Sequence, residues 1–216
     1  MNAMGRRDIL KQLGAAPVAA GFAISEARAQ RAHEHARREG GAGVGAVGAK
    51  PVERRFFNDH EWATVSVLAD LVIPADSRSG SATDAGVPAF IDFILTDELA
   101  EPRQNEEMQT AVRGGLFWLD RECQKRFSAA FVDGTDAQRR AVLDDIAWPE
   151  RARDEMSQGV AFFGTFRDLV ATGFWTSEMG MNDLGYMGNT FVAEWTGCPP
   201  AVLEKLGLPP GGGGRS

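Results

Sequence analysis

The sequence predicts an all-α fold, a compact bundle of about six helices with an irregular aromatic and glycine-rich C-terminal loop. Apolar side chains recur at spacings of three and four in several segments, which is the period of an amphipathic helix. Two capping boxes, Asn58-x-x-Glu61 and Thr135-x-x-Gln138, mark helix starts. The sequence has no convincing alternating strand and no Asn-Gly hairpin. The helical domain is expected to span residues 53–208.

Two helices are expected to flank a turn-rich segment. The first covers residues 59–73 and stops before Pro74, which lacks the amide hydrogen for the next helical bond. Residues 74–86 are rich in Gly, Ser and Asp and are predicted to form turns. A second helix begins near Pro88, a residue suited to a first helical turn. Its apolar side is formed by Phe90, Ile91, Ile94 and Leu95.

Four further helices follow. Residues 103–128 carry an apolar stripe that predicts one long helix. Gly114-Gly115 lies in the middle of this helix, and each glycine destabilises it by about 1 kcal/mol relative to alanine. We expect the pair to permit a close contact with another helix, and the alternative is a kink. The helix capped at Thr135 should end before Trp148-Pro149. Residues 153–172 predict an aromatic-rich helix, and residues 201–206 a short last one.

The N-terminal residues 1–29 have the order of a cleavable export signal. Basic residues come first, an apolar run at residues 13–24 follows, and the small-x-small sequence Ala27-Arg28-Ala29 closes it. Cleavage is therefore expected after Ala29. The apolar run has about a dozen residues, whereas a membrane-spanning helix needs about twenty. No direct membrane span is expected after cleavage.

The paired arginines resemble the twin-arginine signal, Ser/Thr-Arg-Arg-x-Phe-Leu-Lys. Arg6, Arg7, Leu10 and Lys11 match this pattern, whereas Gly5 and Ile9 replace the hydroxyl residue and the Phe. The resemblance implies export to the periplasm by the twin-arginine translocase, which carries folded proteins. The alternative is that the arginines are the basic part of an ordinary secretory signal.

The remaining chain is acidic. Without residues 1–29 it has 19 basic and 28 acidic side chains, a formal charge of −9, which disfavours a nucleic-acid partner. Residues 30–52 are predicted to be a flexible linker. His33 and His35 in this linker are expected to be solvated, because two histidines without a third ligand make a poor metal site. Residues 209–216 are expected to be a disordered tail.

No catalytic, cofactor-binding or metal-binding residue is assigned. His60 is the one histidine outside the linker, and we expect it to face water in the first turn of its helix. The sequence has no Cys-x-x-Cys-His for covalent haem, no phosphate loop and no dinucleotide-binding fingerprint. An oxidoreductase that uses His60 remains an alternative.

The two cysteines, Cys123 and Cys198, are predicted to form a disulfide in an oxidising compartment. The bond would close a loop of about 75 residues and contribute roughly 4 kcal/mol in the chain-entropy estimate. The alternative is a buried Cys123 and a free Cys198.

Four segments together resemble the gluconate 2-dehydrogenase subunit 3 family. They are Phe56-Phe57-x-x-His60-Glu61, the run from Leu68 to Asp76, the run from Asp84 to Asp92, and Asp183 to Asn189 with Trp195-x-Gly197-Cys198-Pro199. The resemblance implies a non-catalytic small subunit of a periplasmic sugar or sugar-acid dehydrogenase. Its partners would be a glucose-methanol-choline-type flavoprotein that holds FAD and a cytochrome c subunit that holds haem.

A chain with an export address and no cofactor site is expected to escort such a flavoprotein and to stabilise it. We expect the C-terminal loop to form the partner contact, because Tyr and Trp anchor interfaces well. The predicted interface residues are Trp175, Asp183, Tyr186, Asn189, Phe191 and Trp195. The alternative is that these aromatic side chains fill the bundle's own core. A periplasmic sugar-binding protein is the remaining functional alternative.

Overall fold

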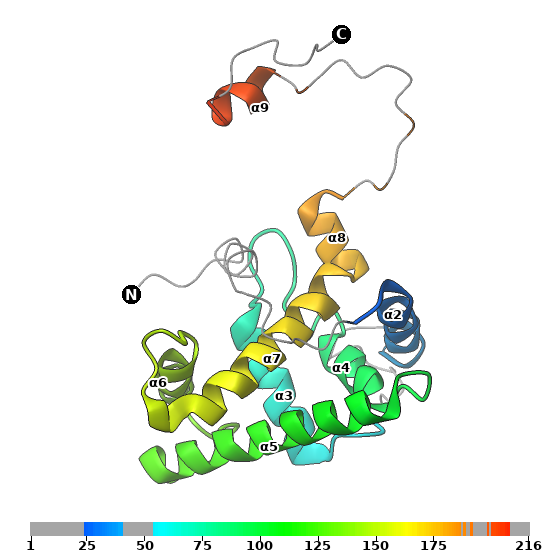
Figure 1. The fold of residues 1–216 in the computed structure, drawn as a ribbon. Coiled ribbons are helices and arrows are strands. Elements are labelled where there is room, and N and C mark those ends of the chain that lie inside the picture. Colours follow the sequence, from blue (N-terminus) through cyan, green and yellow to red (C-terminus); the bar gives the residue numbers. More distant parts are fainter. Residues whose placement is uncertain are drawn as a thin grey trace. The chain divides into compact units, whose positions relative to one another are not determined.

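A computed structural model of the protein describes residues 24–40, 54–186, 188, 191, 198 and 200–207. These residues form helices, turns and bends, so the predicted all-α fold is confirmed (Figure 1). The described residues contain eight α-helices and one 3₁₀ turn, compared with the six helices predicted.

The chain divides into two compact units. The first, Met1–Leu184, contains α2 to α8, and the second, Gly185–Ser216, contains α9. The helix bounds are α2 Glu26–Gly40, α3 Asp59–Val72, α4 Val87–Thr96, α5 Pro102–Phe127, α6 Asp136–Ile146, the 3₁₀ turn η1 Asp154–Met156, α7 Ser157–Trp175, α8 Glu178–Leu184 and α9 Pro200–Lys205. Within the first unit, Pro74–Gly86 forms the predicted turns between α3 and α4.

Both predicted capping boxes are present. The Asn58 side chain accepts the Glu61 backbone N–H at 2.9 Å, and the Glu61 carboxylate accepts the Asn58 N–H at 3.0 Å. Thr135 and Gln138 exchange the equivalent two bonds at the start of α6. Each box satisfies two backbone donors that a helix start otherwise leaves unpaired, which explains why these two helices begin where predicted.

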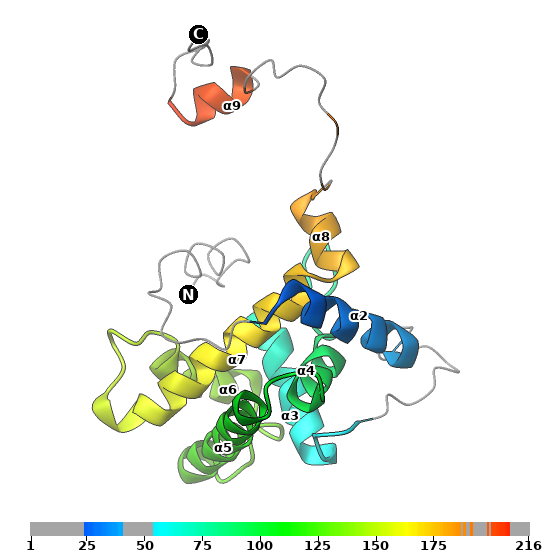
Figure 2. The same ribbon diagram turned by 45° about the vertical axis from the view of Figure 1, so that its right-hand side comes forward.

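Helix α7 is the centre of the first unit. It contacts α2, α3, α4, α5, α6 and α8, and the two views of the ribbon show it crossing among them (Figures 1 and 2). Helix α4 is apolar on nearly every side and buries eight of its ten residues, as expected of a helix packed all round. Phe166 and Phe174 of α7 and Phe90 of α4 are among the side chains with no exposed surface.

Helices α5 and α7 pack closely because each offers a glycine to an aromatic ring of the other. A Cβ at Gly115 of α5 would lie 1.8 Å from Cδ2 of Phe162, and a Cβ at Gly159 of α7 would lie 2.3 Å from Cη2 of Trp118. In both helices the ring comes three residues after the glycine, so the two contacts run antiparallel. Gly115 therefore permits the close contact predicted for the glycine pair, and α5 runs as one helix through it.

Two segments that were predicted to lack regular structure are helical. The linker prediction for residues 30–52 is wrong up to Gly40, because α2 covers Glu26–Gly40 and buries Ala29 and Ala32 in the core. Residues 41–53 lie outside the described part of the chain. The C-terminal loop was predicted to begin after residue 172, but α7 continues to Trp175 and α8 follows it.

Candidate partner-binding surface

Three aspartates stabilise the fold around α3 and α4. They lie in the segments that carry the family resemblance, which are called the motif segments below. Asp92 is 1% exposed, and its carboxylate accepts the backbone N–H groups of residues 55, 56 and 57 at 2.8 to 3.1 Å. Asp70 accepts the N–H of Thr83 at 2.8 Å, which joins α3 to the turn segment. Asp84 accepts the N–H of Ser81 at 2.8 Å. These carboxylates are used as hydrogen-bond acceptors for backbone donors, which is a structural role.

His60 does not simply face water as expected. Its side chain is about half exposed, but Nε2 lies 2.5 Å from Oδ2 of Asp120 on α5. The other oxygen of Asp120 accepts the N–H of Phe131 at 2.9 Å. Asp120 thus connects the start of α3 to α5 and to the segment that precedes α6.

His33 and His35 are also not the solvated side chains that the linker prediction implied. His33 Nε2 lies 2.6 Å from the Thr176 hydroxyl, and its ring lies 4.8 Å from that of Phe90. The His35 ring lies 5.1 Å from the ring of Phe93. No group of three potential metal ligands occurs among the residues that the structure describes.

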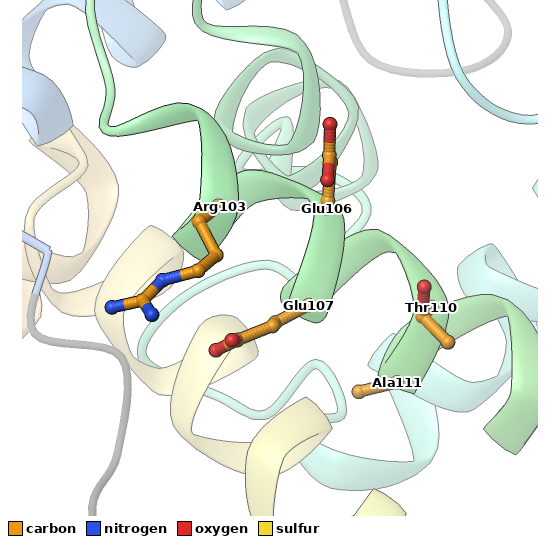
Figure 3. A pocket seen from close by; sticks show the side chains of 5 residues that line it. All are labelled: Arg103, Glu106, Glu107, Thr110 and Ala111. Atoms are coloured by element: carbon orange, nitrogen blue, oxygen red, sulfur yellow. The ribbon is translucent and has the colours of Figure 1, made fainter.

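One shallow hollow of about 550 Å³ lies on the surface of α5. Figure 3 shows that Arg103, Glu106, Glu107, Thr110 and Ala111 line it, that all five come from this helix, and that the two glutamates point in different directions. These residues are exposed. Because a single helix provides the lining, the hollow lacks the converging polar groups of a small-molecule site.

The predicted interface residues fall into four groups. Trp175 packs against the core and meets the Phe174 ring edge to face, with centroids 5.0 Å apart. Asp183 lies in α8, where its carboxylate is 3.0 Å from Nε of Arg78. Tyr186 and Phe191 are 66% and 93% exposed. Asn189 and Trp195 lie outside the described residues.

Phe117 on the outer side of α5 is a further aromatic residue with high exposure, at 67%. Sequence reasoning did not select it. The sequence signal for its exposure is its position in the helix. Phe117 lies off the apolar stripe that contains Leu116 and Leu119, so its side chain is on the outer side of α5.

Both cysteines are free in the structure, so the disulfide stays a prediction. Cys123 is 2% exposed on α5 and Cys198 is exposed in the second unit. Burial is the main cause that raises the pKa of the Cys123 thiol to about 11, and nearby Asp120 adds to this effect.

The predicted export signal is described only at its end. Arg6, Arg7, Leu10 and Lys11 lie outside the described residues, whereas Ala27 and Ala29 are part of α2. Among the residues that the structure describes, no helix is both long enough and apolar enough to cross a membrane.

The fold and surface define a class, a small all-helical protein whose motif carboxylates support the fold and which exposes large aromatic side chains. Residues 59–194 match the family described as Gluconate 2-dehydrogenase subunit 3. The chain belongs to this family, so the resemblance found in the sequence is confirmed. The family name denotes a subunit of a dehydrogenase complex. Neither a curated protein nor a solved structure matches the chain.

Proposed function

We propose that this chain is a non-catalytic small subunit of a periplasmic FAD-dependent dehydrogenase of the sugar or gluconate type. The observation that supports the proposal is the family match over residues 59–194, because the family name denotes a subunit of a dehydrogenase complex. The catalytic partner would be a glucose-methanol-choline-type flavoprotein that holds FAD. A cytochrome c subunit with haem would accept the electrons.

The subunit escorts its flavoprotein partner through the twin-arginine translocase and then stabilises it in the periplasm. The twin-arginine-like residues Arg6 and Arg7 support this role, because that route accepts folded cargo. A flavin is held tightly only by a folded protein, so the partner must be loaded before export.

Tyr186 and Phe191 are the proposed contacts with the partner. Both are large aromatic side chains with most of their surface exposed. Such side chains bury a large area with little loss of conformational entropy, and they are frequent among the residues that dominate binding energy.

The escort role is tested by Arg6→Lys combined with Arg7→Lys, which preserves the charge and removes the arginine pair. We expect this chain and the flavoprotein's dehydrogenase activity both to remain in the cytoplasm. Fractionation with an immunoblot of the chain measures the two locations separately. If the chain stays in the cytoplasm while the activity still reaches the periplasm, the partner is exported independently and the escort role is wrong.

The contact is tested by Tyr186→Ala and Phe191→Ala, with Phe117→Ala as the matched control. All three remove an exposed aromatic side chain, and Phe117 lies on α5 in the other unit. We expect the first two variants to keep the wild-type melting temperature and to lose co-purification with the flavoprotein. Loss of binding in Phe117→Ala alone would instead place the interface on α5.

A further inference from the structure

Helix α2 contains the predicted cleavage sequence, and its buried side holds that sequence against the bundle. Ala29 and Ala32 are 3% and 0% exposed. Arg28 is also buried, and its guanidinium Nη2 donates to Asn105 Oδ1 at 2.6 Å and to the backbone oxygen of Ile94. Its Nε lies 3.3 Å from Oδ2 of Asp97. Burial lowers the pKa of Arg28 from its usual value, and the Asp97 charge opposes that effect.

Further contacts extend along the helix. Arg31 Nη2 lies 2.9 Å from the same Asp97 oxygen, so one carboxylate that is 4% exposed serves both arginines. One helical turn further, the rings of His33 and His35 lie against Phe90 and Phe93 of α4. Figure 2 shows α2 beside α4 and the C-terminal part of α7, which agrees with the contacts between these helices.

The bond that a signal peptidase would cut, between Ala29 and Gln30, is therefore inside a docked helix. The N–H of Ala29 donates to the carbonyl of Ser25 at 2.9 Å. Peptides that are recognised through their main chain commonly bind in an extended conformation. Hydrolysis of this bond, in which water gives a carboxylate on Ala29 and an amine on Gln30, thus requires α2 to leave α4 and unwind locally.

We propose that α2 is a latch that shields the export signal's cleavage site in the folded chain. The site is cut only when α2 undocks, and until then the N-terminal segment remains attached to the bundle. This inference rests on the export signal of the proposed function. It does not depend on which partner the chain escorts.

The test compares cleavage rates of purified full-length chain and of a synthetic peptide covering residues 13–40, with purified signal peptidase. Mass spectrometry identifies the product that begins at Gln30. We expect the native chain to be cut at least about tenfold more slowly than the peptide, because proteolysis of a folded protein follows the population of its open form. Equal rates would overturn the proposal.

Two matched variants connect the protection to docking, and both leave residues 13–40 unchanged. Asp97→Asn removes the shared carboxylate charge, and Glu98→Gln makes the same chemical change at the adjacent exposed residue. We expect Asp97→Asn to be cut about tenfold faster than the wild type, because breaking a buried ion pair leaves charge uncompensated. Glu98→Gln should be cut at the wild-type rate. A folded Asp97→Asn chain that is cut as slowly as the wild type would also overturn the proposal.

Circular dichroism checks that Asp97→Asn keeps its helices. If it unfolds, Asn105→Ala replaces it, because this change leaves the Asp97 carboxylate in place and removes one acceptor of Arg28 together with the bond from Asn105 Nδ2 to the Asp97 carbonyl. Faster cleavage of that variant supports the latch, and an unchanged rate contradicts it. The in vitro rates are independent of export, so a failed latch leaves the escort role standing, and a failed escort role leaves the protection standing.

Discussion

Substituting alanine at the two adjacent glycines of α5 should change stability in opposite directions. A Cβ at Gly114 would meet no atom within 4 Å, whereas a Cβ at Gly115 would lie 1.8, 2.1 and 2.6 Å from three atoms of the Phe162 ring. The two substitutions are chemically identical and occupy consecutive positions of one helix. The difference between them therefore isolates the contact with α7.

The magnitudes follow from two effects. Replacing glycine by alanine inside a helix stabilises it by about 1 kcal/mol. This gain applies at both positions, so Gly114→Ala should raise the free energy of unfolding by roughly that amount. At Gly115, ordinary contact begins near 3.4 Å, so the ring must move well over an ångström while Phe162 is 4% exposed. Overpacking costs about 1 to 3 kcal/mol, and here we expect the upper end, a net loss of about 2 kcal/mol.

Thermal and urea unfolding followed by circular dichroism measures both effects. In a chain of this size 1 kcal/mol shifts the melting temperature by about 2 to 4 °C, so Gly114→Ala should melt higher by about that much and Gly115→Ala lower by about 4 to 8 °C. Adding Phe162→Leu to Gly115→Ala should restore part of the loss, because the two sites are in contact. Equal stability of the two alanine variants would refute the close packing of α5 on α7.

Four other outcomes are expected. Asp92→Ala should lower the free energy of unfolding by about 2 to 4 kcal/mol in urea titrations, because it leaves three backbone N–H groups unpaired, one of them buried. The control Asp144→Ala, at an exposed position, should change the free energy of unfolding by less than about 0.5 kcal/mol. His60→Ala should lose at most about 1 kcal/mol, as for an exposed ion pair, and leave the dehydrogenase activity of the complex unchanged; a large loss of activity would favour a catalytic His60. Thiol titration of the native chain tests the predicted disulfide, which would give no free thiol, whereas the free cysteines of the structure would give one fast thiol, Cys198, and Cys123 only after unfolding. In the chain with free cysteines, burial raises the pKa of Cys123 from 9.0 to about 11, so the folded state holds its proton longer, and urea unfolding should show stability falling as pH rises between these values.

The helices that begin at local signals could be predicted from the sequence. The starts of α3 and α6 depend on hydrogen bonds between residues three apart, and those residues are visible in the sequence itself. The long helix α5 was also predicted to within one residue at each end, because its apolar stripe extends over seven turns.

Helix α2 could not be predicted in the same way, because its docking depends on distant partners. Its buried surface consists of two alanines and a charged side chain, which leave no apolar period to detect. The groups that stabilise it, Asp97 and Asn105, lie 66 to 77 residues away in the sequence. A buried arginine needs such partners, and only the folded structure supplies them.

Helix α8 was missed for a related reason. Glycine is a poor helix former, yet Gly180 is required in α8 because a Cβ there would lie 2.0 Å from the carbonyl oxygen of Phe174. The Ser177 hydroxyl then accepts the N–H of Gly180 at 3.1 Å and acts as a cap. This tertiary contact overrides local propensity.

The surface was predictable only in part. Aromatic composition selected Tyr186 and Phe191, which are exposed, but it also selected Trp175, which packs against the core. Composition reports the type of side chain, whereas exposure depends on which neighbours cover it. For the same reason, the aspartates of the motif segments could be recognised from the sequence as a family feature, whereas the backbone groups that they bind could not be predicted.

The central claim is that the chain itself performs no redox chemistry and serves a flavoprotein partner. The most direct measurement is the absorbance spectrum and sugar oxidation of the purified chain, alone and after co-expression with the flavoprotein. We predict a colourless, inactive chain alone and a yellow, active complex that contains both proteins. A purified chain that carries a flavin or haem spectrum, or that oxidises a carbohydrate unaided, would contradict it.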